Sequence, residues 1–168
     1  MSLKLDDTSL REKFYELSRK LHPDRFVNAV LPEPTYSLRW TTALNRAYQT
    51  LRDPVQRTYY LLEHLEVLPN KASQVPLELA EAYFELQDLL TEEKGIEKMK
   101  LFKSRLCNEL HLLEAKWAEM ATDWETSSDR KVILGNLQAY LNKRRYLSSM
   151  ISDLEKKIGS GDHGDRWH

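Results

Sequence analysis

A helical pattern has to stop at Leu21-His22-Pro23-Asp24-Arg25-Phe26. Upstream of this stretch, large apolar side chains recur at spacings of three and four residues, which places them on one face of a helix. They are Leu10, Phe14, Leu17 and Leu21. Pro23 disfavours helical geometry at His22 and has no backbone N–H to donate. The sequence therefore predicts a helix to about Leu21, followed by a rigid, exposed corner that presents the His22 imidazole and the Asp24 carboxylate.

Caps and prolines mark the other helix ends in the first half of the chain. Thr8 or Ser9 can cap the first helix, and Glu12 lies three residues after Ser9, as in a capping box. A second helix is predicted over 36–51 and is expected to pack antiparallel to the first. Its inward side carries Leu44, Ala47, Tyr48 and Leu51. Asp53-Pro54 then restarts the chain as the N-cap and first residue of a third helix. This helix carries Val55, Tyr59, Leu62 and Leu65.

The second half of the chain reads as a bundle of three helices. No proline follows Pro76, and apolar residues repeat at helical spacing. In a helix at 77–90 the core stripe is Leu79, Ala82, Leu86 and Leu89 or Leu90. The next series is Ile96, Met99, Phe102, Leu106, Leu110, Leu113, Trp117, Met120 and Trp124. The last is Ile133, Leu137, Tyr140, Leu147, Ile151, Leu154 and Ile158, with Arg144 in one slot. Each stripe needs the other two helices to bury it, so the sequence predicts an all-α fold with an antiparallel three-helix bundle.

Composition excludes several classes of function. With 30% charged residues and a net charge of −1, neither nucleic acid nor a membrane is expected as a partner. The single cysteine, Cys107, excludes an internal disulfide framework and a Cys-x-x-Cys zinc site, and His163 and His168 lack metal-ligand spacing. We therefore expect no cofactor and no metal. No apolar stretch approaches the length of a membrane span and no targeting segment is recognised, so a reducing, aqueous compartment is expected.

An enzyme is disfavoured because the sequence has no H-E-x-x-H, no G-x-S-x-G and no phosphate-cradling glycine loop. His22 and Asp24 could act as acid–base partners, but on an open corner both would be hydrated and weakly perturbed. Taken alone, the corner could also be an ordinary proline-containing loop that follows a helix. Its setting favours a binding function, because Arg19 and Lys20 precede it and Arg25 follows it.

The corner and the second helix together resemble a J domain, the module with which DnaJ-type co-chaperones stimulate DnaK-type ATPases. The resemblance rests on His22-Pro23-Asp24 and on the string Asn-x-Ala-Tyr-x-x-Leu-x-Asp-Pro at 45–54. It implies contact with the chaperone through the corner and the basic helix before it. The residues concerned are His22, Pro23, Asp24, Arg19, Lys20 and Arg25. A J domain normally opens with a short helix that bears an aromatic pair, which is missing here. We expect Leu3 and Leu5 to cover part of the core in its place.

A J domain followed closely by a helical bundle is similar to the HscB family, the J-proteins dedicated to iron–sulfur cluster assembly. The resemblance covers about 10–158 and includes Arg145-Tyr146-Leu147. The expected organisation is a J domain at 1–68, a linker at 69–75, a bundle at 76–158 and a disordered tail at 159–168.

The resemblance implies that the bundle binds the scaffold protein IscU and that the J domain stimulates HscA, a DnaK-type chaperone, so that clusters are transferred to acceptors. The chain itself would catalyse no reaction. It also implies the cytoplasm of a bacterium or, in a eukaryote, the mitochondrial matrix.

The family's scaffold-binding patch lies on the first and last helices of the bundle. In this chain the predicted patch is Leu77, Ala80, Phe84, Asp88, Arg145 and Tyr146. All six lie off the core stripes, and those on the first helix share a face with Glu81. Two other interpretations stay open. In one, Phe84 packs on the J domain or the linker and Tyr146 is merely half exposed. In the other, the register is shifted by one residue and Tyr83 makes the contact.

A general DnaJ-like co-chaperone, or a helical adaptor not dedicated to cluster assembly, is the alternative function. The intact His22-Pro23-Asp24 argues against an adaptor, because a purely structural loop has no need of it. Binding to IscU separates the HscB-like function from that of a general co-chaperone.

Overall fold

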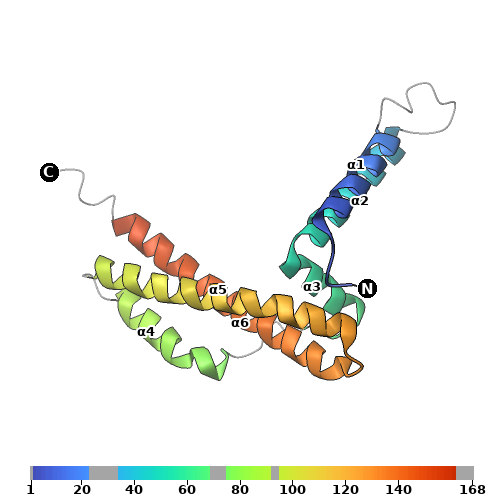
Figure 1. Ribbon diagram of the computed structural model, residues 1–168. Helices are drawn as coiled ribbons and strands as arrows, with labels where there is room; N and C mark the ends of the chain where they lie inside the picture. The colour runs from blue at the N-terminus through green and yellow to red at the C-terminus, as the bar shows by residue number, and fades with distance from the viewer. Residues whose placement is uncertain (1, 23–33, 69–74, 92–94, 162–168) are drawn as a thin grey trace. The chain divides into compact units, whose positions relative to one another are not determined.

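The computed structural model describes residues 2–22, 34–68, 75–91 and 95–161 (Figure 1). In chain order the elements are α1 (Asp7–Leu21), α2 (Pro34–Arg52), α3 (Pro54–His64), the 3-10 helix η2 (Leu77–Leu79), α4 (Ala80–Thr91), α5 (Ile96–Thr126) and α6 (Arg130–Gly161). No strand occurs in these four ranges, and the predicted all-α fold is confirmed. Of the helices described, none is long and apolar enough to cross a bilayer.

The chain divides into two compact units. Unit 1 comprises Met1–Val67 together with Trp124–Thr126, and unit 2 comprises Leu68–Asp123 together with Ser127–His168. Unit 1 thus holds α1 to α3, and unit 2 holds η2, α4, most of α5 and α6. Helix α6 continues to Gly161, so helical structure extends into the segment expected to be a tail. The rest of that tail and most of the expected linker lie outside the described residues.

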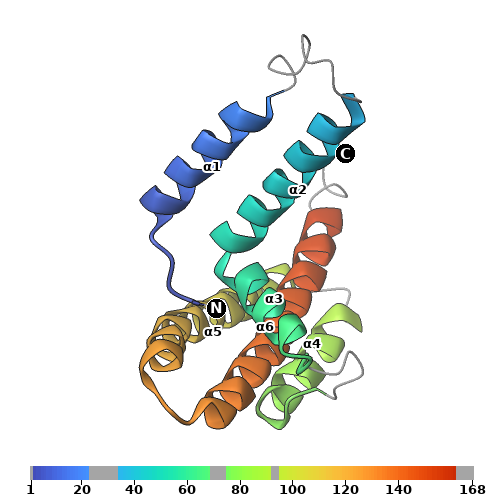
Figure 2. The same ribbon diagram turned by 90° about the vertical axis from the view of Figure 1, so that its right-hand side faces the viewer.

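Helices α1 and α2 form the antiparallel hairpin of unit 1 (Figures 1 and 2). Phe14 of α1 stacks on Tyr48 of α2, with ring centroids 4.2 Å apart. Helix α3 contributes the buried Leu61 and Leu62. The last turn of α1 lies at the end of the hairpin that is remote from α3 (Figure 2).

The start of α1 differs from the prediction. Its N-cap is Asp6, not Thr8 or Ser9, because the Asp6 carboxylate accepts hydrogen bonds from the Ser9 backbone N–H at 2.8 Å and from the Ser9 hydroxyl at 2.6 Å. An aspartate caps as well as a serine and adds a negative charge at the positive end of the helix dipole, so the helix begins earlier. The predicted start of α3 is confirmed. There Asp53 accepts from the backbone N–H groups two and three residues later, at 2.7 and 3.1 Å.

The segment before α1 is not helical and is anchored at Leu3. This side chain is fully buried, its carbonyl accepts a hydrogen bond from the Arg57 guanidinium, and its N–H donates to Glu125 Oε1 at 2.8 Å. The Ser2 hydroxyl donates to the same oxygen at 2.7 Å and is the main reason that the pKa of Glu125 is lowered. Leu5 stays 38% exposed. Of the two leucines expected to cover the core, only Leu3 does so.

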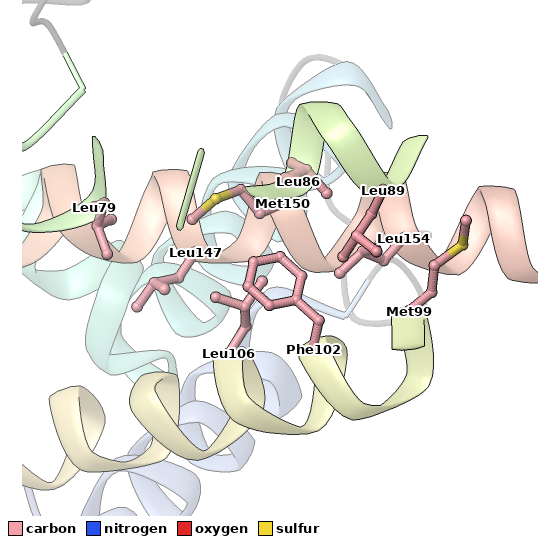
Figure 3. Packing of buried hydrophobic residues seen from close by; sticks show 9 residues of the cluster. All are labelled: Leu79, Leu86, Leu89, Met99, Phe102, Leu106, Leu147, Met150 and Leu154. Atoms are coloured by element: carbon pink, nitrogen blue, oxygen red, sulfur yellow. The ribbon is translucent and has the colours of Figure 1, made fainter. Parts of the chain in front are cut away.

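The core of unit 2 lies where α4, α5 and α6 meet. Nine buried side chains from η2 and these helices point toward one another (Figure 3). They are Leu79, Leu86, Leu89, Met99, Phe102, Leu106, Leu147, Met150 and Leu154. The predicted stripes supply all of them except Met150, which lies beside its stripe on α6. Full burial of one such side chain stabilises the fold by about 1.5–3 kcal/mol, so this cluster accounts for much of the unit's stability.

Helices α5 and α6 run antiparallel and are joined by ion pairs at their margins (Figure 1). Lys103 Nζ lies 2.8 Å from Glu155 Oε1, and Arg144 Nη2 lies 3.2 Å from Glu114 Oε1. The pair with Glu114 explains why an arginine interrupts the apolar series of α6: its guanidinium reaches a carboxylate on α5 instead of entering the core. Ile96 was predicted in the core, but as the first residue of α5 it remains 38% exposed.

Candidate functional site

Helix α1 ends at His22 in the conformation that the following proline imposes. His22 has φ −60° and ψ 132°, which is extended, and its side chain is exposed. Arg19 and Lys20 occupy the last turn and are also exposed. Cations in this position interact favourably with the helix dipole. The predicted helix end is confirmed, whereas the remainder of the predicted chaperone site, 23–25, lies outside the described residues.

The charge of this last turn is partly offset within α1. Glu16 accepts hydrogen bonds from Lys13 Nζ at 2.7 Å and from Lys20 Nζ at 2.6 Å. These two ammonium groups lower the pKa of Glu16 to about 2, with the hydrogen bond from Lys13 the largest cause. Glu16 therefore stays ionised at physiological pH and holds the Lys20 side chain along the helix. Among the described residues Arg19 has no such ion pair, so its guanidinium is the more available cation of the turn.

An exposed apolar face lies on η2 and α4 in unit 2. Leu77 is 90% exposed and Phe84 is 69% exposed, whereas the adjacent Tyr83 is 37% exposed. Ala80 is half-buried, and Asp88 lies exposed one turn beyond Phe84. Because Phe84 is the more exposed aromatic side chain, the structure supports the predicted register over the one shifted to Tyr83. Within unit 2, Phe84 is not packed into the core.

Arg145 and Tyr146 on α6 are less accessible than the residues on α4. Both are half-buried, and Tyr146 packs against the core cluster of unit 2. The Arg145 guanidinium carbon lies 5.1 Å from the centroid of the Tyr146 ring, and its Nη2 donates to Asn142 Oδ1 at 3.0 Å. Tyr146 is therefore half exposed, and part of its ring supports the core. The cluster it packs against also contains Leu79 and Leu86, which connects the α6 part of the predicted patch with α4.

Sequence reasoning missed Lys143, which holds η2 against the two long helices. Its Nζ lies 2.9 Å from Glu78 Oε2 and 3.0 Å from Glu109 Oε1. Burial acts to lower the pKa of Lys143, but the hydrogen bonds to the two carboxylates outweigh it and the pKa is raised. The hydrogen bond from Lys143 also lowers the pKa of Glu78. Because Glu78 directly follows Leu77, this bridge positions the start of the exposed face. The signal in the sequence was a lysine flanking an apolar stripe, a position where interhelical ion pairs are common.

The described residues offer little that suits a metal ion. Within them no group of three or more His, Cys, Asp and Glu side chains gathers closely enough to hold one. Cys107 is a free, half-buried thiol on α5. The histidines at 163 and 168 lie outside the described residues.

Comparisons with known proteins agree with this arrangement. No model of a known protein family matches the chain. An HscB co-chaperone homologue of Burkholderia vietnamiensis is 43% identical over 58 residues, which make up 34% of this chain and 33% of the relative. The homologue of Shewanella halifaxensis is 41% identical over 61 residues, 36% of this chain and 35% of the relative. The chain therefore spans about a third of the length of these curated relatives.

A solved structure extends the likeness to the whole fold. Chaperone HscB from Vibrio cholerae matches with a TM-score of 0.64 at 20% sequence identity, and the match covers 95% of this chain and 92% of that one. The relatives are co-chaperones by name. Over the residues that align, the chain is similar to these HscB co-chaperone homologues, and over nearly its whole length it has the HscB fold.

Proposed function

We propose that this chain is a co-chaperone that binds IscU through unit 2 and stimulates the ATPase of HscA, a DnaK-type chaperone, through the end of α1. The observation that carries the proposal is the exposed, extended His22 directly after a basic helical turn and directly before Pro23-Asp24. A loop that only connected two helices would not need this combination.

On the chaperone side, the proposal assigns different roles to the corner and to the helix. The Asp24 carboxylate is a suitable partner for an arginine of the chaperone, because a guanidinium binds a carboxylate through two parallel hydrogen bonds. Arg19 and Lys20 carry charge that steers the approach to an acidic surface. Such steering acts mainly on the association rate and weakens as salt is added.

On the scaffold side, the proposal rests on the exposed face of η2 and α4. Leu77 and Phe84 are large apolar side chains held in water, with Glu81 and Asp88 exposed beside them. An apolar patch with a polar rim is typical of a protein-binding site. We assign Ala80, which is half-buried, to the floor of this surface, and Arg145 and Tyr146 to its edge on α6.

In this proposal the chain makes and breaks no bond. It couples two binding events, so that the chaperone hydrolyses ATP when the scaffold has been delivered. A general co-chaperone would stimulate the ATPase without binding IscU, and a helical adaptor would not stimulate it. The two measurements therefore separate all three functions.

The proposal is tested by single-turnover ATPase assays with HscA, combined with titration of IscU. We expect His22→Gln and Asp24→Asn to abolish stimulation and to leave IscU affinity unchanged, since neither residue lies in unit 2. Lys20→Gln and Lys13→Gln form a matched pair, because both lysines contact Glu16 but only Lys20 lies in the last turn. Lys20→Gln should slow association at low salt and Lys13→Gln should not. Full stimulation by Asp24→Asn would refute the J-domain mechanism.

A further inference from the structure

Helix α2 has an unusual charge composition for a helix on the surface of a nearly neutral protein. Its 19 residues include Arg39, Arg46 and Arg52 but no aspartate or glutamate. The whole chain, by contrast, has a net charge of −1. The positive charge of α2 therefore has no acidic counterpart on the same helix.

Two of these arginines line a hollow on the surface of α2. Its lining consists of Leu38, Arg39, Thr42, Ala43 and Arg46. These positions are spaced by one, three or four residues and share one face of the helix. Arg39 and Arg46 are seven residues apart, so their Cα atoms are separated by two helical turns, about 10.5 Å along the axis.

This face of α2 is not the one that packs on α1. The contact with α1 is made by Tyr48, which stacks on Phe14. At 100° per residue, Tyr48 points about 160° away from Arg46. The hollow therefore lies on the outward face of the α1–α2 hairpin.

The hollow combines apolar surface with available cations. Leu38, which lines the hollow, is 66% exposed. The Thr42 hydroxyl is occupied, because it donates to the Leu38 carbonyl at 2.8 Å. Within the described part of the chain neither Arg39 nor Arg46 forms an ion pair. The polar groups that remain for a ligand are thus two guanidinium groups, with Ala43 between them and Leu38 beside Arg39.

We propose that this face of α2 is a docking surface for an acidic, amphipathic helix of a partner protein. A carboxylate can be held by each guanidinium through two hydrogen bonds, which favours arginine over lysine for this purpose. Two carboxylates seven residues apart on a partner helix match the spacing of Arg39 and Arg46. Apolar side chains of the partner helix would cover Ala43 between the two arginines and Leu38 beside Arg39. None of the residues that line the hollow belongs to the chaperone-binding or scaffold-binding residues proposed above, so this surface goes beyond the function proposed there.

A protein helix fits this surface better than a nucleic acid does. Binding to a phosphate backbone gains affinity from many neutralised phosphates, and two arginines on a chain of net charge −1 supply few. The exposed Leu38, beside Arg39, and Ala43, between the two arginines, offer nothing to a phosphate. They do offer apolar contact to a leucine or methionine on a partner helix.

The test uses the full-length, ¹⁵N-labelled chain and a synthetic helical peptide with two glutamates seven residues apart and leucines between them. We expect the peptide to shift the backbone amide resonances of α2 around Leu38 to Arg46. The double variant Arg39→Gln/Arg46→Gln should raise the dissociation constant of the peptide on the order of tenfold, because each exposed ion pair strengthens binding by up to about fivefold. Added salt should weaken binding in the same direction.

Arg52→Gln is the matched control, because it removes the same charge from the same helix. Arg52 points about 120° away from Arg46, off the lining of the hollow. It should change the dissociation constant by less than about twofold. An equal effect of Arg52→Gln, equal binding of a peptide with lysines in place of the glutamates, or shifts confined to the last turn of α1 would overturn the proposal. Displacement of the peptide by an oligouridylate would assign the surface to nucleic acid instead. Thermal melting of each variant checks that the fold is retained.

Discussion

Phe84→Ala separates binding from folding, because most of the Phe84 ring lies in water. The residue is 69% exposed. An aromatic side chain has roughly 200 Å² of surface to bury, so about 140 Å² is available to a partner and about 60 Å² already contributes to the fold. At about 25 cal/mol per Å², covering the exposed part is worth up to about 3.5 kcal/mol and the buried part up to about 1.5 kcal/mol.

These magnitudes predict unequal effects of the substitution. The free energy of IscU binding should fall by about 2–3.5 kcal/mol, which corresponds to an increase of roughly 30- to 300-fold in the dissociation constant. The free energy of unfolding should fall by no more than about 1.5 kcal/mol. Isothermal titration calorimetry measures the first quantity, and urea denaturation measures the second.

Two neighbouring substitutions serve as controls. Leu86→Ala truncates a side chain that is only 1% exposed, so it should cost about 2–5 kcal/mol of stability. Tyr83→Ala changes the other aromatic residue of this turn, which is 37% exposed, and should weaken IscU binding less than Phe84→Ala does.

A large loss of stability with little loss of IscU affinity would refute the assignment of Phe84 to the binding surface. If the Phe84→Ala variant loses as much stability as Leu86→Ala but binds IscU normally, Phe84 belongs to the core. A larger loss of affinity in Tyr83→Ala than in Phe84→Ala would show that the binding face is centred one residue earlier.

Two further predictions concern ion pairs and hydrogen bonds. The pKa of Glu125 is lowered by its hydrogen bonds, so the carboxylate stays ionised and the contact with Leu3 persists below the ordinary glutamate pKa, and it is lost as pH falls through the lowered value. The Leu3 amide resonance should titrate with that low midpoint, and a midpoint at the ordinary value would contradict the contact. Lys143→Met should cost about 0.5–1 kcal/mol in urea denaturation and raise the pKa of Glu78, which loses its ammonium partner. Lys143→Arg should retain most of the stability, and an unchanged Glu78 carboxyl titration in Lys143→Met would argue against the bridge with Glu78 and Glu109.

The sequence alone determined where the main helices lie, because the signals involved are local. Pro23 forces extended geometry on His22, and Asp53-Pro54 is both a cap and a compatible first residue, so these boundaries follow from a few neighbouring atoms. The apolar periodicity of α4, α5 and α6 is equally local. It placed Phe84 off the core stripe, and the side chain is indeed exposed.

The residue that caps α1 was harder to predict, because several nearby side chains can act as caps. Asp6, Thr8 and Ser9 are all good caps within four residues, and only the hydrogen bonds from Ser9 to Asp6 distinguish them. Helix α6 likewise continues to Gly161 although glycine is a poor helix former.

Only the tertiary structure decided which residues meet across the chain. The backbone groups of the buried Leu3 are hydrogen-bonded to the Arg57 guanidinium on α3 and to the Glu125 carboxylate at the end of α5. No feature of the sequence near Leu3 indicates either partner. Lys143 joins Glu78 and Glu109, which are separated from it by 65 and 34 residues. A local pattern specifies which side of a helix is apolar. It does not specify which distant polar group will complete a hydrogen bond, because that depends on where the packed helices bring their surfaces together.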